Sequence, residues 1–510
     1  MKVETYARFE GDLRANDHPY MSGAFTPVHE ELTAFYEPGD AEVSGIIPED
    51  LDGVYLRNTQ NPLHQPLGTY HVFDGDGMIH AVRFKRGRVE YRNRFLRTTA
   101  FQMELAAGRS LFAGLIDPPS VARFPGWGAR GGLRDAASTD VVVHAGSALA
   151  TFYQCGVPFR LDAFTLEPAG HETFGGRLPV TDGAGGFDQG MSAHCKVDEQ
   201  NGELLFFNYS KRAPYMHYGV VNADNVLVHY TPIPLPGARL PHDMSFTENY
   251  AILDDFPLHW DPQALSEGKH AVRYFREQPS RMAVIPRRGS AADIVWFEAA
   301  PTYVLHWINA WEEQTPDGLE IVRHGYFQGQ PLPSNKDRGR GFDNKGRSLG
   351  AGRYEPHIHE WRLNLRTGKV RERALDDTVC EFGMINGRYA GRPYRYSYNP
   401  IPVDDAFLFN GLMKFDHVTG DKQWVSFGER RYASESPMAP RLNARAEDDG
   451  YVVSFITDEQ AQCSEVAVLD AKRLADGPVC TIRLPHKISS GTHSCWAPGS
   501  DVRPFGGTAA

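Results

Sequence analysis

Four histidines have neighbours that suit metal binding. The chain contains 20 histidines, but these four each adjoin an apolar, strand-like segment. They are His194 in MSAHCKVD, His242 in LPHDMSFTENYAIL, His306 in TYVLHWINAWEE and His493 in GTHSCWAP. They lie far apart along the chain, unlike the two ligands that a HExxH motif places on one helical turn. Neutral imidazole is a ligand for iron, copper, zinc and nickel, and four of them leave open positions on a six-coordinate ion.

Ligands this far apart need a fold that brings distant segments to one point. A weak repeat, in which a strand ends in an apolar-Asp step, then turns into another strand, recurs through the chain, as in KVDEQNGELLFF and KFDHVTGDKQWVSF. Asp or Asn at the start of the turn and Gly near its end satisfy the turn backbone. Units of roughly 40–50 residues are typical of β-propeller blades, whose inner strands converge on one axis. The sequence therefore predicts an all-β, seven-bladed propeller with the histidines on its axis.

Two further features support this reading. GVYLRN, from Gly53, predicts a strand, and the segment from Thr69 to Thr98 predicts a meander in which YHVF, MIHAVRF and RVEYRNRFL are strands. Its turns are Asp74-Gly75-Asp76-Gly77 and Arg86-Gly87, and such Asp-Gly turns are typical of hairpins. Residues 100–132, which are rich in Gly and Pro and include one short helical pattern, are expected to form part of a cap over the metal. The whole chain, 1–510, is then one domain with cap insertions.

Composition excludes several other classes of protein. The net charge of -11 argues against an extended nucleic-acid surface. No apolar run reaches the ~18 residues of a membrane-spanning helix, and the N-terminus has no apolar core of a secretory signal. The six cysteines form no CxxC pair, and reduced thiols indicate a cytoplasmic protein.

Other candidate sites have simpler explanations. His357 and His359 have metal-like spacing, but alternation along a strand accounts for it. The acidic turn Asp74–Gly77 lacks the full ligand set of an EF-hand calcium loop, so a hairpin turn is preferred. Asp243 and Glu248, beside His242, are interpreted as turn and strand-face residues. Glu312 and Glu313, close to His306, are interpreted as near-site groups or as surface carboxylates, and spacing does not choose between these.

Several of these segments, taken in order, resemble the carotenoid cleavage oxygenase family. The resembling segments are PEDLDGVYLRNTQNP, YHVFDGDGMIHAVRF, AHCKVD, HDMSFTENY, LHWINAWEE, EFGMINGRYAGRPYRYSY, ESPMAPR and THSCWAP, which span nearly the whole chain. The family includes carotenoid and apocarotenoid dioxygenases, stilbene-cleaving enzymes and the retinoid isomerase of the visual cycle. The resemblance implies an Fe(II) site built by His194, His242, His306 and His493, with O2 as co-substrate and no haem or flavin.

The resemblance also implies partners for the histidine rings. Family glutamates accept hydrogen bonds from the iron ligands, and Glu381 in EFGMIN and Glu435 in ESPMAPR match two of them. The third glutamate falls in a segment that here reads ATFYQCG, where Gln154 takes its place. Glutamine accepts a hydrogen bond but carries no charge, so this site is expected to be more electron-poor than is usual in the family.

The implied reaction is oxidative cleavage of a C=C double bond to two carbonyl products, without a side chain acting as nucleophile or general base. The expected substrate is an elongated apolar carotenoid or apocarotenoid. The alternative is a stilbene or phenylpropanoid alkene. Stilbene-cleaving members hold a phenolic hydroxyl with a lysine, and Ser147 in HAGSALA is interpreted as standing at the matching place, which favours the carotenoid.

Three hypotheses stay open beside this one. A non-catalytic propeller scaffold would bind no iron, and an iron-dependent isomerase would release the polyene intact. Residues Leu111 to Ser120 either form an apolar patch for weak peripheral membrane contact or pack within the cap. No obligate protein partner and no nucleic acid are expected.

Overall fold

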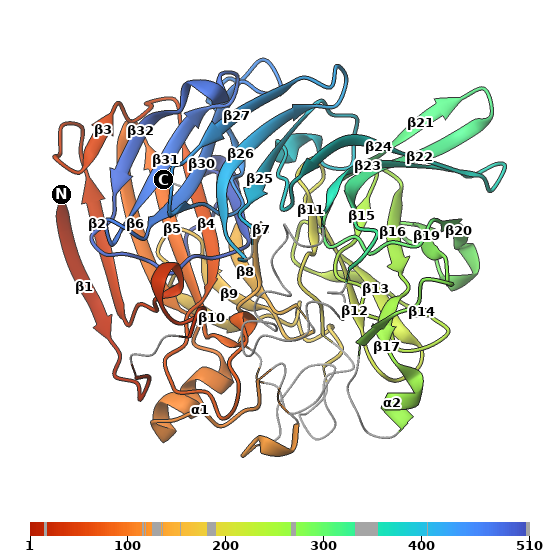
Figure 1. The fold of residues 1–510 in the computed structure, drawn as a ribbon, viewed down its shortest axis with the longest axis horizontal. Helices are drawn as coiled ribbons and strands as arrows, with labels where there is room; N and C mark the ends of the chain where they lie inside the picture. The colour runs from red at the N-terminus through yellow and green to blue at the C-terminus, as the bar shows by residue number, and fades with distance from the viewer. Residues whose placement is uncertain are drawn as a thin grey trace.

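Short strands rich in β-branched and aromatic residues, separated by Gly, Asn and Asp turns, fold here into antiparallel sheets. The structure is a computed structural model. It describes residues 1–14, 18–114, 117, 119–124, 134, 136–153, 155–180, 190–266, 272–331, 355–404 and 406–505. The sheets are arranged as the blades of a seven-bladed propeller (Figure 1), which confirms the predicted fold class.

The first two blades, from the axis outwards, are built as follows. The first is β33 (Ser494–Pro498), β4 (Gly53–Gln60), β5 (Gly77–Lys85), β6 (Arg88–Phe95), β2 (Glu30–Tyr36) and β1 (Lys2–Arg8). The second is β7 (Asp140–His144), β8 (Ser147–Thr151), β9 (Phe159–Asp162) and β10 (Pro168–His171). The first blade therefore joins the C-terminal strand to strands from the N-terminal region.

The next three blades have four strands each. They are β11 (Lys196–Asp198), β12 (Glu203–Tyr209), β13 (Tyr215–Val221) and β14 (Leu227–Pro234); β15 (Ser245–Phe246), β16 (Tyr250–Asp255), β19 (Ser280–Pro286) and β20 (Val295–Ala299); and β21 (Trp307–Thr315), β22 (Gly318–Phe327), β23 (His357–Asn364) and β24 (Val370–Val379). A separate hairpin, β17 (Leu258–Trp260) and β18 (Val272–Tyr274), extends from the fourth blade.

The last two blades complete the ring. The sixth is β25 (Tyr396–Pro402), β26 (Phe409–Asp416) and β27 (Lys422–Ser426), with Met384 bridged to Tyr398 on its inner edge. The seventh is β29 (Met438–Pro440), with β28 (Arg431–Tyr432) on the same edge, then β30 (Gly450–Asp458), β31 (Cys463–Asp470), β32 (Pro478–Arg483) and β3 (Val43–Gly45). The N-terminal region thus contributes strands to two neighbouring blades, which closes the ring.

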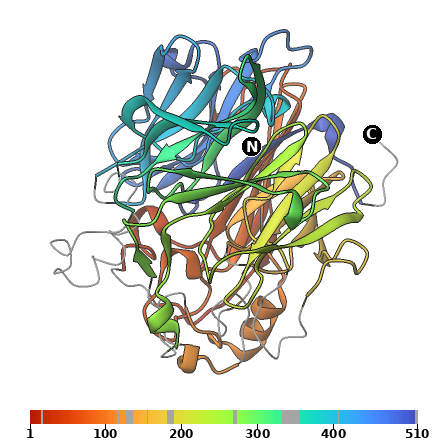
Figure 2. The ribbon, with the colours of Figure 1, turned by 90° about the vertical axis from the view of Figure 1, so that its right-hand side faces the viewer.

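Helices are few. The structure has α1 (Thr99–Ala107) and α2 (Pro262–Ser266), and both lie at the same end of the molecule, the lower end in Figures 1 and 2. Single-turn 3-10 helices lie between strands: η1 (Gly23–Phe25), η2 (Val72–Asp74), η3 (Pro119–Val121), η4 (Ala291–Asp293), η6 (Gly387–Tyr389), η7 (Leu474–Asp476) and η8 (Gly499–Asp501). No helix in the described ranges is long and apolar enough to cross a membrane.

The predicted meander is correct in its second half only. β5 and β6 meet at Arg86-Gly87, where both residues have positive φ angles of 52° and 72°, as a two-residue type I′ hairpin turn requires. YHVF does not form a strand. Its last residues enter η2, because Asp74 accepts a hydrogen bond from the backbone N–H of His71 while His71 accepts one from that of Phe73. This local capping stabilises the turn instead of a sheet ladder.

Residues predicted as cap are partly described. Within them lie α1 and η3, both outside the sheets. Leu111 and Phe112 are buried with Ala100 of α1. These two side chains therefore do not form an exposed membrane patch, and their burial agrees with packing inside the protein; the prediction for 115, 116 and 118 lies outside the described residues. The six cysteines are all free thiols.

Candidate metal centre

The inner strands of the blades each begin with a polar side chain near the axis. Four of these side chains are the predicted histidines: His194 precedes β11, His242 precedes β15, His306 immediately precedes β21 and His493 immediately precedes β33. The inner strands contact one another around the axis, as β33 does with β7 and β29, and β15 with β21. The blade architecture therefore brings residues that are distant in sequence to one point.

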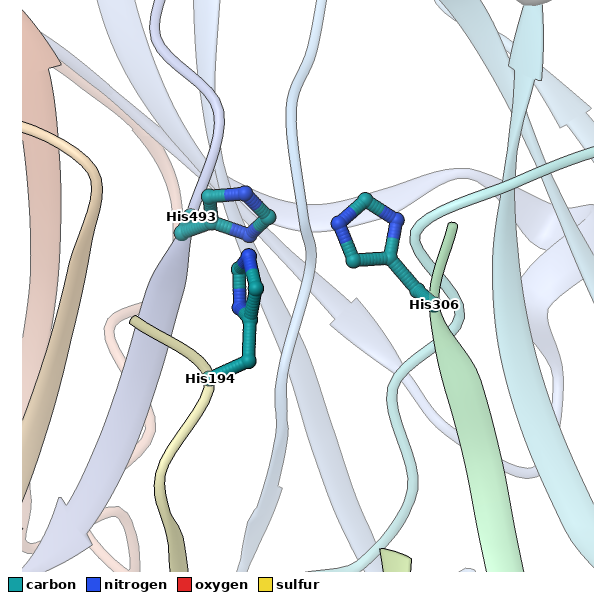
Figure 3. A group of neighbouring side chains, drawn as sticks. All are labelled: His194, His306 and His493. Carbon is teal, nitrogen blue, oxygen red and sulfur yellow. The ribbon is translucent and has the colours of Figure 1, made fainter. Parts of the chain in front are cut away.

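The four histidine rings form one cluster. Centroids of neighbouring rings lie 4.4 Å (His194–His493), 4.7 Å (His194–His242) and 5.0 Å (His242–His306 and His306–His493) apart. One nitrogen from each of His194, His306 and His493 lies within 4.8 Å of the other two. Figure 3 shows these three rings pointing toward one another from separate segments. His242 completes the cluster beside His194 and His306, although it is only half-buried.

Carboxylates hold three of the rings by Nδ1. His306 Nδ1 donates to Glu381 Oε2 at 2.7 Å, and His493 Nδ1 donates to Glu435 Oε1 at 2.9 Å. These are the two glutamates named from the sequence. His194 Nδ1 lies 3.2 Å from Asp140 Oδ2, a residue that the sequence reasoning missed. Fixing Nδ1 in this way leaves Nε2 as the free lone-pair donor of each ring.

Two of those Nε2 atoms are otherwise orphaned. Nε2 of His194 and Nε2 of His306 are buried and have no hydrogen-bond partner among the described residues. Buried polar atoms in native proteins nearly always have a partner, and one that has none needs an explanation. A divalent cation bound between the rings supplies it, so the donor set fits a metal such as Fe(II).

Burial also sets the protonation states that a metal needs. It lowers the pKa of His194, His242 and His306 well below the usual value, and repulsion between neighbouring imidazoles adds to this effect. These rings are therefore neutral at neutral pH, ready to donate a lone pair. Burial acts in the same direction on His493, but the charge and hydrogen bond of Glu435, together with the charges of Asp140 and Asp243, outweigh it and the pKa of His493 is raised. Burial raises the pKa of the Glu381 carboxyl well above its usual range.

Asp243 ties three of the ligand segments together. Its Oδ1 pairs with Lys196 Nζ at 2.7 Å, and its Oδ2 accepts the backbone N–H of Trp307 at 2.8 Å. Asp243 follows His242, Trp307 follows His306, and Lys196 lies two residues beyond His194. Its interpretation as a simple turn residue was therefore incomplete, because its buried side chain links three blades.

A second buried pair braces two of the same segments. Arg323 of β22 donates to Ser245 Oγ at the start of β15 and to Asp254 Oδ1 at 2.7 Å. Asp254 Oδ2 accepts the indole N–H of Trp307, and the Arg323 guanidinium lies 3.4 Å from the centroid of a Trp307 ring. The beginnings of β15 and β21, which carry His242 and His306, are thus fixed relative to each other.

Two residues at this centre have a strained backbone. His194 has a φ of 63° and Phe382, next to Glu381, has a φ of 57°. Positive φ in a non-glycine residue costs free energy and persists where the surroundings impose it, commonly at functional sites. At Glu381, one carboxylate oxygen accepts both His306 Nδ1–H and the backbone N–H of Phe382, which holds this conformation.

Aromatic rings lead away from the histidines toward a cavity. The Phe382 ring lies 4.4 Å from that of His306, and contacts continue to Phe407 at 5.7 Å and then to Phe73 at 5.9 Å. Phe73, with Tyr70, Phe112, Phe152 and Tyr153, lines a cavity. The same cavity also has polar walls, formed by His64, Glu104 and Arg134 among others. A row of packed aromatic rings therefore lies between the histidine cluster and this cavity, whose walls are partly polar.

Other residues named from the sequence lie away from the centre. Ser147 is in the turn at the far end of the β7–β8 hairpin from Asp140, which at 3.3 Å per residue is roughly 13 Å along the strand. Its Oγ accepts a hydrogen bond from Arg160, so Ser147 does not face the metal site and its identity says nothing of the substrate. Glu312 binds Thr247 and Asn249, and Glu313 pairs with Arg362.

Two predictions remain: Gln154 as a partner of a histidine ring, and His357 with His359 as an alternative metal-binding pair. Gln154 lies outside the described residues, so its predicted place beside the metal is untested. His359, of the alternative pair with His357, is on β23, which is separated from the axis by β21 and β22. The sequence reasoning missed Asp140, although its context offered a signal. Asp140 directly precedes the apolar run VVV, just as each predicted ligand precedes a strand.

The fold and site together define a class of protein: a seven-bladed propeller with an axial cluster of histidines held by carboxylates. Residues 25–498 match the family model described as Retinal pigment epithelial membrane protein. The chain is 31% identical over 502 residues to carotenoid 9,10(9',10')-cleavage dioxygenase 1 of Arabidopsis thaliana, with 93% of this chain and 89% of that protein covered. It therefore belongs to the carotenoid cleavage oxygenase family, as the sequence motifs predicted.

The relatives differ in what their names say they act on. Isoeugenol monooxygenase of Pseudomonas nitroreducens is 29% identical over 506 residues, covering 95% of this chain and 99% of that protein. Among solved structures, lignostilbene dioxygenase of Pseudomonas brassicacearum aligns with a TM-score of 0.81 and 27% identity, covering 96% of this chain and 100% of that one. The family thus shows oxygenase chemistry on alkenes and leaves the substrate of this chain undetermined.

Proposed function

We propose that this protein is a non-haem Fe(II) dioxygenase that cleaves a C=C double bond of a carotenoid or apocarotenoid into two carbonyl products, with O2 as co-substrate. The observation that carries the proposal is the convergence of four histidine rings whose buried Nε2 atoms, at His194 and His306, have no described partner. His194, His242, His306 and His493 would hold the ion. Iron bound there supplies the activation of O2.

The protein's own groups then have three tasks. Glu381 and Glu435 orient His306 and His493 and raise the electron density on their Nε2 atoms. Asp243 and Arg323 hold the ligand segments in register. Phe382 and the rings that follow it keep water away and align an elongated apolar substrate beside the metal. No residue is needed as general acid or base, because the alkene itself supplies the electrons that reduce O2.

The cap belongs to the same proposal. Glu104 of α1 and residues after the helix, including Phe112, line the aromatic cavity. We expect this segment to cover the substrate and separate it from bulk water. The protein is proposed to work in the cytoplasm on a small apolar molecule, without nucleic acid or an obligate protein partner. Any membrane contact would be weak and would not use Leu111 or Phe112, which are buried.

A second candidate substrate class is supported by particular relatives. The isoeugenol monooxygenase and the lignostilbene dioxygenase match this chain over nearly their full lengths. The polar cavity walls at Glu104 and Arg134 suit a phenolic hydroxyl as well as the carbonyl or hydroxyl end of an apocarotenoid. With Ser147 remote from the site, the absence of a lysine there no longer argues against phenolic alkenes. Stilbene or phenylpropanoid cleavage is therefore the alternative.

Anaerobic reconstitution tests the proposal. Purified protein is loaded with Fe(II), mixed with carotenoids, apocarotenals, hydroxystilbenes or isoeugenol, and exposed to O2; mass spectrometry identifies the products. Two carbonyl fragments from a polyene support the main proposal, and fragments from phenolic alkenes alone support the alternative. Recovery of an intact, isomerised polyene indicates an isomerase. An iron-loaded protein that cleaves nothing in the panel contradicts the proposed function, and a protein that binds no iron indicates a scaffold.

A further inference from the structure

The positions of the polar side chains around the axis follow the order of the blades. Taken from the first blade, the inner strands present His493, Asp140, His194, His242, His306, Glu381 and Glu435. The three carboxylates are thus distributed among four histidines, with Asp140 between His493 and His194. β7, which begins with Asp140, contacts both β33 and β11, the strands that follow these two histidines.

Asp140 has the contacts of a residue built to hold a ring. Its Oδ2 lies 3.2 Å from His194 Nδ1, and its Oδ1 accepts the backbone N–H of Val141 at 2.7 Å. The side chain of Asp140 is buried, with the residue 8% exposed. Glu435 has the same arrangement, with one oxygen on a histidine Nδ1 and the other on a backbone N–H. Asp140 therefore contacts His194 in the same way as Glu435 contacts His493.

The uncharged residue at position 154 makes the contact between Asp140 and His194 more important. At the position where the family resemblance expects a third glutamate, this chain has Gln154, which carries no charge. A dication on four neutral imidazoles gains electrostatic stabilisation from each buried carboxylate within a few ångströms. Among the described residues, Glu381 and Glu435 are the other carboxylates whose oxygens lie against a ring of this cluster.

We propose that Asp140 is the positioning residue of His194, and that it supplies from the start of β7 the carboxylate that Gln154 does not supply. This inference rests on the proposed metal site. It reverses the expectation of an electron-poor centre, because three carboxylates again surround the ion.

The proposal is tested by Asp140→Asn, which keeps the shape and removes the charge. Fe(II) affinity is measured by competition with a chelator, and the ligand field is read from the visible absorption of the Co(II)-loaded protein. Loss of an outer partner of a metal-binding histidine typically costs about 10–100-fold in affinity. We expect a loss of that size and a shifted Co(II) spectrum. Asp458→Asn is the matched control, since Asp458 is also 8% exposed but lies at the end of β30, paired with Arg431.

A rescue variant separates charge from structure. In Asp140→Asn combined with Gln154→Glu, a carboxylate returns at the position where the family resemblance expects one, and we expect affinity and spectrum to recover. Unchanged metal binding in Asp140→Asn overturns the proposal, and so does a loss that Gln154→Glu fails to repair. If circular dichroism shows Asp140→Asn to be unfolded, Asp140→Glu decides: retained affinity supports the proposal and lost affinity contradicts it. A wild-type protein that binds neither ion refutes the metal site itself.

Discussion

Glu435 holds His493 and the beginning of the strand that follows it at the same time. Its Oε1 accepts His493 Nδ1–H at 2.9 Å, and its Oε2 accepts the backbone N–H of Ser494 at 2.6 Å. The Ser494 hydroxyl donates in turn to the Glu435 carbonyl oxygen at 3.0 Å. The carboxylate therefore fixes both the ring and the strand that carries it.

Glu435→Gln is expected to weaken metal binding about 10–100-fold. An amide offers one acceptor oxygen, whereas both Glu435 oxygens accept a hydrogen bond here, so the NH2 group must face a donor. Chelator competition on the Fe(II) protein measures the effect. Glu313→Gln is the control, because Glu313 pairs with Arg362 away from the axis; equal affinities in the two variants would show that Glu435 has no influence on the metal.

His242→Gln is expected to reduce metal affinity by more than the loss of an outer partner does, because it removes a ligand. The ring of His242 lies 4.7 Å from that of His194 and 5.0 Å from that of His306. His359→Gln is the matched exchange at a buried histidine on β23, and it should leave metal content unchanged. Elemental analysis of both purified variants tests this, and full metal occupancy in His242→Gln would reduce the site to three histidines.

Arg323→Met is expected to lower the free energy of unfolding by about 3–5 kcal/mol, because it leaves the charge of buried Asp254 unpaired. Urea denaturation measures this loss. Arg366→Met is the control: Arg366 and its partner Asp317 are both exposed, and such a pair contributes at most about 1 kcal/mol. Because Arg323 also braces the beginnings of β15 and β21, the first variant should lose metal affinity as well, and an equal stability for both variants would contradict the buried role.

Stability is expected to fall on acidification. Burial lowers the pKa of His144 and of His486 to about 4. Between about pH 6.5 and 4 the unfolded chain takes up a proton at each position while the folded protein does not, so the free energy of unfolding decreases as the pH falls. Each group contributes up to about 3 kcal/mol over that range.

His486→Gln isolates one of these contributions. Urea midpoints measured at about pH 7 and about pH 5 should differ less in this variant than in the wild type, because one half-buried imidazole with a lowered pKa is removed. His171→Gln, at an exposed position, is the control and should keep the wild-type difference. An unaltered pH dependence in His486→Gln would show that its ring is not buried in the folded protein.

The histidine cluster could be predicted because each of the four histidines lies shortly before an inner strand. The pattern of a polar residue followed by an apolar run is local, and the propeller converts it into a shared position on the axis. The hairpin at Arg86-Gly87 was also predictable, since its turn chemistry lies in two adjacent residues.

Contacts between blades could not be predicted in the same way. Asp243 looked like a turn residue because its partners, Lys196 and Trp307, are distant in sequence. The family resemblance placed Ser147 where stilbene-cleaving members have a lysine, whereas the β7–β8 hairpin carries it to the end opposite Asp140. YHVF has strand propensity, but the reciprocal hydrogen bonds of His71 and Asp74 select a turn.

Because β33 is the last strand to be synthesised, it sets the point at which the propeller can close. It pairs with β4, from the other end of the chain, and carries the last histidine immediately before it. During synthesis, His194, His242 and His306 leave the ribosome long before His493 does. The full set of four histidines therefore comes together only after the ring has closed, so the proposed metal site is completed in the last step of folding.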